Sequence, residues 1–589
     1  MELSARQYRD LLRTYLKPQW FRVLLLAVFL FASISLQLLN PLILRYFIDV
    51  AKSVGPSNVL TNAAVLFICV VVANQMLSAL STYLSADVGW TATNNLRSDL
   101  ALHCLRLDMW FLHEHPPGEL LERIDGDVGI LSNFFSQFVI RVLSNLLLLI
   151  GIVTVLLVAD WRLGLALMIY TFVGLVLLSR IQWLAAPYFQ ADRKIAADIV
   201  SFWEERLTAR EDICANRAKM HVMRRYYELL RSLLHIGRKS LVMFRAFQSA
   251  SVILLALVTA FVFAIGVYRL NQGLITIGTI YLAFHLTGMA GWSVFRITEQ
   301  LETLQRARAG LVRINELYHT RSRLQIVPAD ERSLNLQASR KSEPLSVDFD
   351  DVSFEYQPGV PILRNISFRL APNRVLGLLG RTGSGKTTLA RLLVHFYEPS
   401  RGTVHLGGKA LRQIPPAEMH RQVGLVTQEV QLFHATVRDN LTFFERTVSD
   451  ERILDVIKEL GLLPWYNTLP NGLDTELAAG GQGLSAGEAQ LLALTRVFLQ
   501  DPGLVILDEA SSRLDPATEH LITRAVDQLL KDRTAIIIAH QLKTVQRADE
   551  IMILEDGNVI EHSSREALAN DPSSRFYQLL RIGSEEVLA

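Results

Sequence analysis

Six uncharged, strongly apolar stretches in the first half of the chain limit the possible folds more than any other feature. They cover residues 23–44, 59–86, 142–159, 163–179, 246–268 and 270–295. A bilayer core is crossed by about 20 helical residues, and inside lipid every backbone polar group must be bonded within the chain. The stretches therefore predict six transmembrane helices. The long side chains of Arg162 and Arg180 and the flanking residues 134–140 can extend the two shorter ones.

Two connections between these stretches are long, charged and compatible with helix, at residues 87–141 and 180–245. Basic residues are frequent in both and in the N-terminal segment, whereas the short connections carry few. By the positive-inside rule, the N-terminus and the long connections face the cytoplasm, and so does the chain after the sixth stretch. We expect a multi-pass protein of the cytoplasmic (inner) membrane.

The composition indicates more than one domain. The 589 residues are 50% hydrophobic with a mean hydropathy of +0.26, and the apolar residues concentrate before residue 296. A polar stretch, 328–344, precedes a region of strand-like alternation. We expect a transmembrane domain at 1–318, a linker at 319–344 and a nucleotide-binding domain at 345–589. The net charge of +2 gives no indication of a nucleic-acid partner.

The second half contains a phosphate-binding loop. Residues 380–387 read Gly-Arg-Thr-Gly-Ser-Gly-Lys-Thr and lie between an apolar run, 375–379, and a helix-like run, 388–394. Glycines let successive N–H groups surround phosphate oxygens, and the start of the helix adds a favourable dipole. Lys386 can neutralise the β- and γ-phosphates, and the Thr387 hydroxyl can hold Mg²⁺. The loop therefore predicts binding of ATP or GTP.

A second nucleotide element is the apolar run 504–507, which ends in Asp508 and Glu509. Asp508 suits Mg²⁺, and Glu509 lies where a carboxylate can orient or deprotonate the attacking water. The alternative is a strand that ends in a solvated acidic turn. The P-loop earlier in the chain favours the first interpretation.

Between these two elements lies Leu-Ser-Ala-Gly-Glu at 484–488. This segment resembles the Leu-Ser-Gly-Gly-Gln signature of the ATP-binding cassette (ABC) transporters. Further family motifs occur in the right order. The resemblance implies that Tyr356 stacks on adenine, that Gln428 joins Mg²⁺ and the membrane domain, and that His540 contacts the γ-phosphate.

The resemblance implies a complete set of site residues. The residues expected to bind ATP are Tyr356, Gly380, Arg381, Thr382, Gly383, Ser384, Gly385, Lys386, Thr387, Thr388, Gln428, Ser485, Gly487 and Asp508. The expected Mg²⁺ ligands are Thr387, Gln428 and Asp508. The expected catalytic residues are Glu509 and His540.

The first half resembles the exporter class of the same family. Residues 117–127 are similar to its first intracellular segment, and 273–278 are similar to the entry to its sixth span. The implied fold is an α-helical membrane domain of six transmembrane helices with long cytoplasmic extensions, plus an α/β P-loop nucleotide-binding domain. The implied protein is a half-transporter in the lipid bilayer. It pairs with a second half-transporter, whose signature closes the ATP site, and exports a small hydrophobic or amphipathic molecule, a lipid or a peptide.

The signature of this chain departs from the family pattern. Ala486 adds a methyl group where backbone approaches phosphate, and Glu488 places a carboxylate near an anionic ligand. Alternatively, Ser485 and Glu488 form a capping box at the start of a helix. Arg513 also replaces a small residue in a later family motif. We therefore expect a heterodimer with one weakened ATP site, and a homodimer is the alternative.

Other functions remain open on the sequence alone. An importer built on the exporter fold, as in some siderophore systems, has the same motifs. An ATP-gated channel or regulator is disfavoured because Glu509 is intact, and the six apolar stretches exclude a soluble ABC ATPase. Candidate cargo contacts lie near one face of the sixth stretch: His285, Met289, Trp292 and Arg296. The alternative for His285 is a hydrogen bond to a neighbouring helix.

Overall fold

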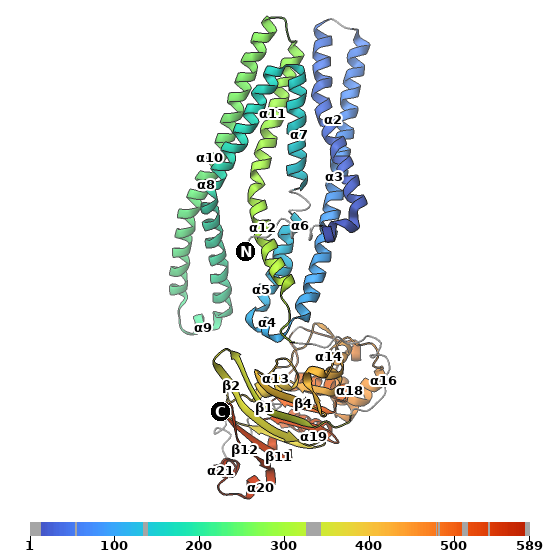
Figure 1. Ribbon diagram of the computed structural model, residues 1–589, viewed down its shortest axis with the longest axis vertical. Coiled ribbons are helices and arrows are strands. Elements are labelled where there is room, and N and C mark those ends of the chain that lie inside the picture. The colour runs from blue at the N-terminus through green and yellow to red at the C-terminus, as the bar shows by residue number, and fades with distance from the viewer. Residues whose placement is uncertain are drawn as a thin grey trace. The chain divides into compact units, whose positions relative to one another are not determined.

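The computed structural model describes residues 13–53, 56–133, 139–324, 343–478, 480, 483–508, 516–539, 542 and 544–582. The chain forms two compact units (Figure 1). The helical unit comprises Met1–Arg106 and His115–Arg321, and the α/β unit comprises Leu107–Glu114 and Ser322–Ala589. The short segment Leu107–Glu114 therefore packs with the α/β unit although it lies within the first half of the sequence.

The helical unit is built mainly from very long helices. Its described helices are η1 (Lys17–Gln19), α2 (Trp20–Lys52), α3 (Ser57–Arg106), α5 (Pro117–Leu121), the π-helix η2 (Glu122–Asp127), α6 (Val128–Asn133), α7 (Val139–Ala159), α8 (Trp161–Thr208), α9 (Arg210–Ala215), α10 (Lys219–Asn271), α11 (Ile277–Glu299) and α12 (Leu301–His319). In Figure 1, α2 runs along α3 and α8 runs along α10, with α9 at the end of the second pair. Because α8 has 48 residues and α10 has 53, both are much longer than a bilayer requires. The predicted helical character of the long connections is confirmed.

Five helical segments of the described chain are long and apolar enough to cross a membrane. They are Arg13–Lys52, Ser57–Arg106, Arg141–Ala159, Trp161–Thr208 and Lys219–Asn271. Large apolar side chains on these segments are exposed, for example Ile68 (60%) and Phe172 (70%), as expected for surfaces that face lipid.

The predicted start of the sixth stretch, 270–295, is wrong, because the helix begins later in the chain. The chain turns at Gly273 (φ 72°), and α11 begins at Ile277, after Thr276 caps it by accepting a hydrogen bond from the Thr279 backbone N–H. This helix of 23 residues is long enough to cross a bilayer core but is less apolar than the other five. Helix α11 packs against α2, α7, α8 and α10. Because its surface contacts these helices, it carries small and polar residues at positions where a lipid-facing helix would carry large apolar ones.

The α/β unit contains two main sheets. The antiparallel sheet has the order β2 (Val360–Leu370), β1 (Val347–Gln357), β4 (Arg401–Leu406) and β5 (Lys409–Ala410). The second sheet has the order β12 (Asn558–Ser564), β11 (Glu550–Glu555), β3 (Val375–Leu379), β10 (Thr534–Ile538), β9 (Leu504–Asp508) and β6 (Val423–Val426). A short pair, β7 (Ala435–Thr436) and β8 (Glu476–Leu477), completes the described strands.

Helices cover these sheets. The described helices of the unit are α4 (Met109–Glu114), α13 (Lys386–Leu393), η4 (Leu411–Gln413), α14 (Pro416–Gln422), α15 (Val437–Thr442), α16 (Asp450–Glu459), α17 (Leu463–Tyr466), η5 (Gly472–Asp474), α18 (Ala486–Gln500), α19 (Pro516–Leu530), η7 (Thr544–Arg547), α20 (Arg565–Asn570) and α21 (Arg575–Ile582). Strand β3 is buried along its whole length, and its alternate residues enter two different cores. Leu376 and Leu378 pack into the core shared with the antiparallel sheet, while Val375 and Leu379 pack against helices such as α18 on the other face.

The positions of the site residues follow from the direction of the strands. Strands β11, β3, β10, β9 and β6 are parallel, so their carboxyl ends lie along one edge of the sheet. The P-loop follows β3, and Asp508 ends β9 with only β10 between them. This arrangement brings together segments more than a hundred residues apart in sequence.

Candidate functional site

The P-loop has a backbone conformation that requires glycine. Gly380, Gly383 and Gly385 have φ angles of 152°, 85° and 104°, which L-residues rarely adopt. A Cβ atom on Gly380 would lie 2.3 Å from the Leu554 carbonyl oxygen, whereas the space beside Gly383 is open to 4 Å. The loop is therefore packed tightly behind Gly380 and open at Gly383, as a phosphate cradle needs.

The polar groups of the loop fit a bound phosphate. The Lys386 ammonium is buried and donates hydrogen bonds to the carbonyl oxygens of Gly380 (2.6 Å) and Arg381 (3.0 Å). The Ser384 Oγ is buried and has no hydrogen-bond partner among the described residues. Buried polar atoms are normally bonded, so this hydroxyl favours a ligand in the loop. The remaining loop residue, Thr382, is exposed.

Two of the three expected Mg²⁺ ligands meet in the structure. The Thr387 hydroxyl donates a hydrogen bond to the Asp508 carboxylate at 3.2 Å. Asp508 is buried at the end of β9, where its charge needs a cation or several donors. The hydroxyl and carboxylate oxygens suit a hard cation such as Mg²⁺. The third expected ligand, Gln428, is exposed in the loop after β6, the strand next to β9.

The expected adenine contact, Tyr356, lies in a cluster of aromatic rings. Its ring centroid is 4.9 Å from that of Phe354 and 5.2 Å from that of Tyr397, both in edge-to-face geometry. The Tyr356 hydroxyl also lies 3.3 Å from Oγ1 of Thr388, near the start of α13. Tyr356 is therefore linked directly to the helix that follows the P-loop. Burial raises the pKa of the Tyr397 phenol.

Sequence reasoning missed Trp110, a further member of this aromatic cluster. Its ring lies 5.4 Å from Tyr397 and 6.2 Å from Tyr356, centroid to centroid. His113 of the same short helix, α4, lies 6.0 Å from Tyr356. The only available signal was an aromatic residue in an otherwise charged connection, and sequence alone does not connect it with a strand about 245 residues away.

A second segment of the α/β unit holds α4 in place. The Asp108 carboxylate accepts hydrogen bonds from the Phe111 backbone N–H (3.1 Å), from the Ser322 hydroxyl (3.0 Å) and from the backbone N–H of Arg323. The Arg323 guanidinium lies 5.3 Å from the Trp110 ring centroid, within the range of a cation–π interaction. The chain that follows α12 thereby fixes the helix that carries Trp110.

The altered signature forms a capping box at the start of α18. The Ser485 Oγ accepts a hydrogen bond from the Glu488 N–H (3.2 Å), and the Glu488 carboxylate accepts one from the Ser485 N–H (2.7 Å). Gly487 is buried in the first turn of this helix. The capping alternative is confirmed.

The half-buried guanidinium of Arg496 connects α18 to neighbouring loops. Arg496 donates hydrogen bonds to the carbonyl oxygens of Asn440 (2.6 Å) and Gln431 (3.0 Å) and lies over the Phe443 ring. Burial lowers the pKa of Arg496 to about 10. Glu509, His540 and Arg513 lie outside the described residues.

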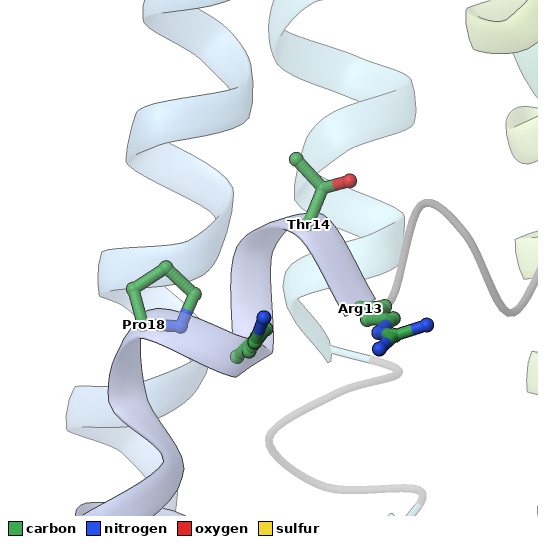
Figure 2. Close-up of a pocket in the computed structure, with 4 residues that line it drawn as sticks. Arg13, Thr14 and Pro18 are labelled. Atoms are coloured by element: carbon green, nitrogen blue, oxygen red, sulfur yellow. The ribbon is translucent and has the colours of Figure 1, made fainter.

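A second candidate site is a cavity of about 850 Å³ in the helical unit. Its lining includes three of the four candidate cargo contacts, Met289, Trp292 and Arg296. His285 is not among the lining residues, and its ring stacks on Tyr281 with the centroids 6.1 Å apart. Another hollow lies at the start of the unit beside Arg13, Thr14, Lys17 and Pro18. In Figure 2 its labelled side chains point in different directions and do not converge on one point, so we assign it no function.

Comparisons with known proteins agree with both halves of the chain. Residues 23–290 match the family described as the ABC transporter transmembrane region, and residues 363–512 match the family described as ABC transporter. An uncharacterized ABC transporter ATP-binding protein of Bacillus subtilis is 27% identical over 94% of this chain and 91% of its own length.

Other relatives carry more specific names. An ATP-dependent lipid A-core flippase of Alcanivorax borkumensis is 28% identical over 85% of both chains. A mycobactin import ATP-binding/permease protein of Mycolicibacterium smegmatis is 30% identical over 84% of this chain and 56% of its own length. The structure of a bacterial Atm1-family ABC exporter with ATP bound superposes with a TM-score of 0.81 over 96% of this chain and 99% of that chain. At 22% identity, this likeness establishes the fold alone.

Proposed function

Because the chain belongs to the ABC transporters and joins an exporter-type transmembrane region to an ATP-binding domain, we propose that it is one half of a heterodimeric exporter of amphipathic molecules. It is an ATPase coupled to transport.

The capping box at Ser485 and Glu488 carries the heterodimer proposal. In this family a signature helix closes the ATP site of the opposite chain, so its first N–H groups must reach the γ-phosphate. Here the Glu488 carboxylate already accepts from the Ser485 N–H at 2.7 Å. The carboxylate therefore occupies one donor at the helix N-terminus, and its negative charge there repels phosphate. The site closed by this signature is therefore the weaker one.

The chain's own P-loop supports a fully active second site. Its glycine conformations, the buried Lys386 and the Thr387–Asp508 pair fit ATP with Mg²⁺. Mg²⁺ would be held by Thr387, Asp508 and Gln428 and would neutralise charge on the phosphates. Glu509 is proposed to position and deprotonate the attacking water, and His540 to contact the γ-phosphate.

Purification of the full chain tests the heterodimer proposal directly. We expect low ATPase activity from this chain alone and a large gain after co-purification with a second half-transporter. A stable homodimer with high, substrate-stimulated ATPase activity would contradict the proposal.

Transport in inverted membrane vesicles tests the direction. We expect ATP-dependent uptake into inverted vesicles only when both chains are present. ATP-dependent loss of substrate from them would instead support the importer alternative, for which the mycobactin importer among the relatives provides a precedent. Flux without hydrolysis would support a channel.

A further inference from the structure

The ring of Trp110 packs into the aromatic cluster around Tyr356. Its centroid lies 5.4 Å from that of Tyr397, 5.8 Å from that of Phe354 and 6.2 Å from that of Tyr356. These distances fall within the range in which aromatic rings attract one another. Phe354 and Tyr397 belong to the core shared with the antiparallel sheet, and Trp110 and Tyr356 pack against that core. The short helix α4 is therefore joined through one side chain to β1, the strand that carries Tyr356.

The Tyr356 ring has surface left for a ligand and depends on its neighbours for its orientation. Phe354 and Tyr397 are only 1% and 2% exposed, whereas Tyr356 is half-buried. The Tyr356 hydroxyl makes two long contacts, 3.3 Å to Oγ1 of Thr388 and 3.4 Å to the Arg391 guanidinium. Hydrogen bonds of this length are weak, so the surrounding rings largely determine how the Tyr356 ring is tilted.

Trp110 is itself held by charged and polar contacts. The Arg323 guanidinium lies 5.3 Å from the Trp110 ring centroid and donates a hydrogen bond to the Glu114 carboxylate at 3.3 Å. At the other end of α4, the Asp108 carboxylate accepts a hydrogen bond from the Ser322 hydroxyl at 3.0 Å. Both ends of α4 are therefore bonded to the chain that follows α12. The position of Trp110 is set by contacts that do not involve the phosphate-binding loop.

We propose that Trp110 is a positioning residue for ATP, because its packing holds the Tyr356 ring in the orientation on which adenine stacks. Trp110 acts through Tyr356 and does not itself touch the nucleotide. This inference rests on the proposed function, since it concerns the ATP site of that transporter and the expected stacking of adenine on Tyr356.

A positioning role differs from a purely structural one in the part of the ligand that it affects. A tryptophan that only anchors α4 to the α/β unit would affect the stability of the unit and the binding of every ligand alike. A tryptophan that orients Tyr356 affects the contribution of the base and leaves the phosphates unaffected, because the P-loop would bind them.

Two ligands that differ in the base test this proposal. The full chain is placed in phosphatidylcholine nanodiscs and titrated by calorimetry, in the presence of Mg²⁺, with the non-hydrolysable ATP analogue AMP-PNP or with inorganic tripolyphosphate. Both ligands carry a chain of three phosphorus groups, and only AMP-PNP carries adenine. We expect Trp110→Ala to weaken binding of AMP-PNP by about fivefold and binding of tripolyphosphate by less than about twofold.

Further variants separate positioning from anchoring. Trp110→Phe keeps an aromatic ring beside Tyr356, so its affinity for AMP-PNP should stay within about twofold of that of the wild-type chain. When Trp110→Ala is combined with Tyr356→Ala, the affinity should equal that of Tyr356→Ala alone, because the ring that Trp110 positions is gone. Trp465→Ala is the matched control and should leave both affinities unchanged. Trp465 is also half-buried in the α/β unit, but it packs against the other core.

Several outcomes overturn the proposal. Equal weakening of both ligands by Trp110→Ala, or additive losses in the double variant, would show that Trp110 is an anchor. Unchanged binding of AMP-PNP by Trp110→Ala or by Tyr356→Ala would show that Trp110 does not act through stacking. If Trp110→Ala does not fold, Trp110→Leu fills the apolar contact without an aromatic ring and is judged by the same criteria. Failure of the heterodimer proposal is distinguishable, because a homodimer with high ATPase activity would leave these ratios of affinities intact.

Discussion

At the residue scale, substitutions of Tyr356 test whether the aromatic cluster contributes to nucleotide binding. We expect Tyr356→Ala to weaken binding of a non-hydrolysable ATP analogue by about tenfold, since stacking of a base on an aromatic ring contributes roughly 1–3 kcal/mol. Tyr356→Phe keeps the ring and loses only the hydroxyl contact with Thr388, so its affinity should change by less than about threefold. A fluorescence titration of both variants measures the difference, and equal losses would contradict a stacking role.

His395, which lies just after α13, predicts how the stability of the fold depends on pH. Burial lowers the pKa of its imidazole, Arg412 lowers it further, and the Glu398 carboxylate, 4.0 Å away, opposes the shift. A lowered folded-state pKa means that the unfolded state binds more protons, so stability rises with pH. The contribution of His395 to the free energy of unfolding is complete above the pKa of the unfolded state, about 6.5. It is lost as the pH falls through the pKa of the folded state.

The measurement is the midpoint of thermal unfolding of the full chain across this pH range. We expect the unfolding midpoint of the wild-type chain to fall on acidification. The change of the midpoint with pH should be smaller in His395→Asn. Asparagine is the suitable replacement because it tolerates the φ of 60° found at this position. Identical slopes in both chains would show that other groups determine the pH dependence.

At the element scale, the capping box makes separate predictions for its two members. Ser485→Ala removes the acceptor for the Glu488 N–H and should cost about 1 kcal/mol in the first turn of α18. Hydrogen exchange of that turn should then be about fivefold faster. Glu488→Gln retains a side-chain acceptor for the Ser485 N–H, so exchange should be nearly unchanged. Faster exchange in Glu488→Gln than in Ser485→Ala would contradict the capping geometry.

The elements that sequence predicted best were those with a local pattern. The apolar runs 375–379 and 504–507 lie in strands β3 and β9, and the helix after the P-loop is α13. The start of the sixth membrane stretch was misplaced because uncharged residues continue through the turn at Gly273. Only the cap at Thr276 marks the true start of α11.

The parts of the site that escaped prediction depend on contacts distant in sequence. The role of Trp110 depends on its packing against Tyr356 and Tyr397, which no spacing within α4 indicates. The cavity needs four helices to converge, so residues on α2, α3 and α7 such as Gln37, Trp90 and Arg141 were missed. Three of the four contacts predicted on α11 do line the cavity, because the residues on one face of a single helix can be predicted from their spacing.

At the scale of the whole molecule, the proposed function requires two chains for each ATP site. In that proposal the P-loop and Asp508 would bind ATP from one side, and the signature that closes the site would come from the partner. Because this chain's P-loop fits ATP and its signature carries Glu488, the two sites of the assembly should be unequal. The two motifs of one chain would therefore serve two different sites.

This asymmetry predicts unequal effects of mutations within one chain of the assembled transporter. Glu509→Gln in this chain should reduce ATPase activity by about 10²-fold or more, because the proposed base for the active site is lost. Ser485→Ala in the same chain should reduce it less than about twofold, because this signature covers the weaker site. Steady-state ATPase activity of the purified pair measures both, with ATP binding by Glu509→Gln as the control for folding. Similar losses from the two substitutions would mean that both sites turn over, as in a symmetric dimer.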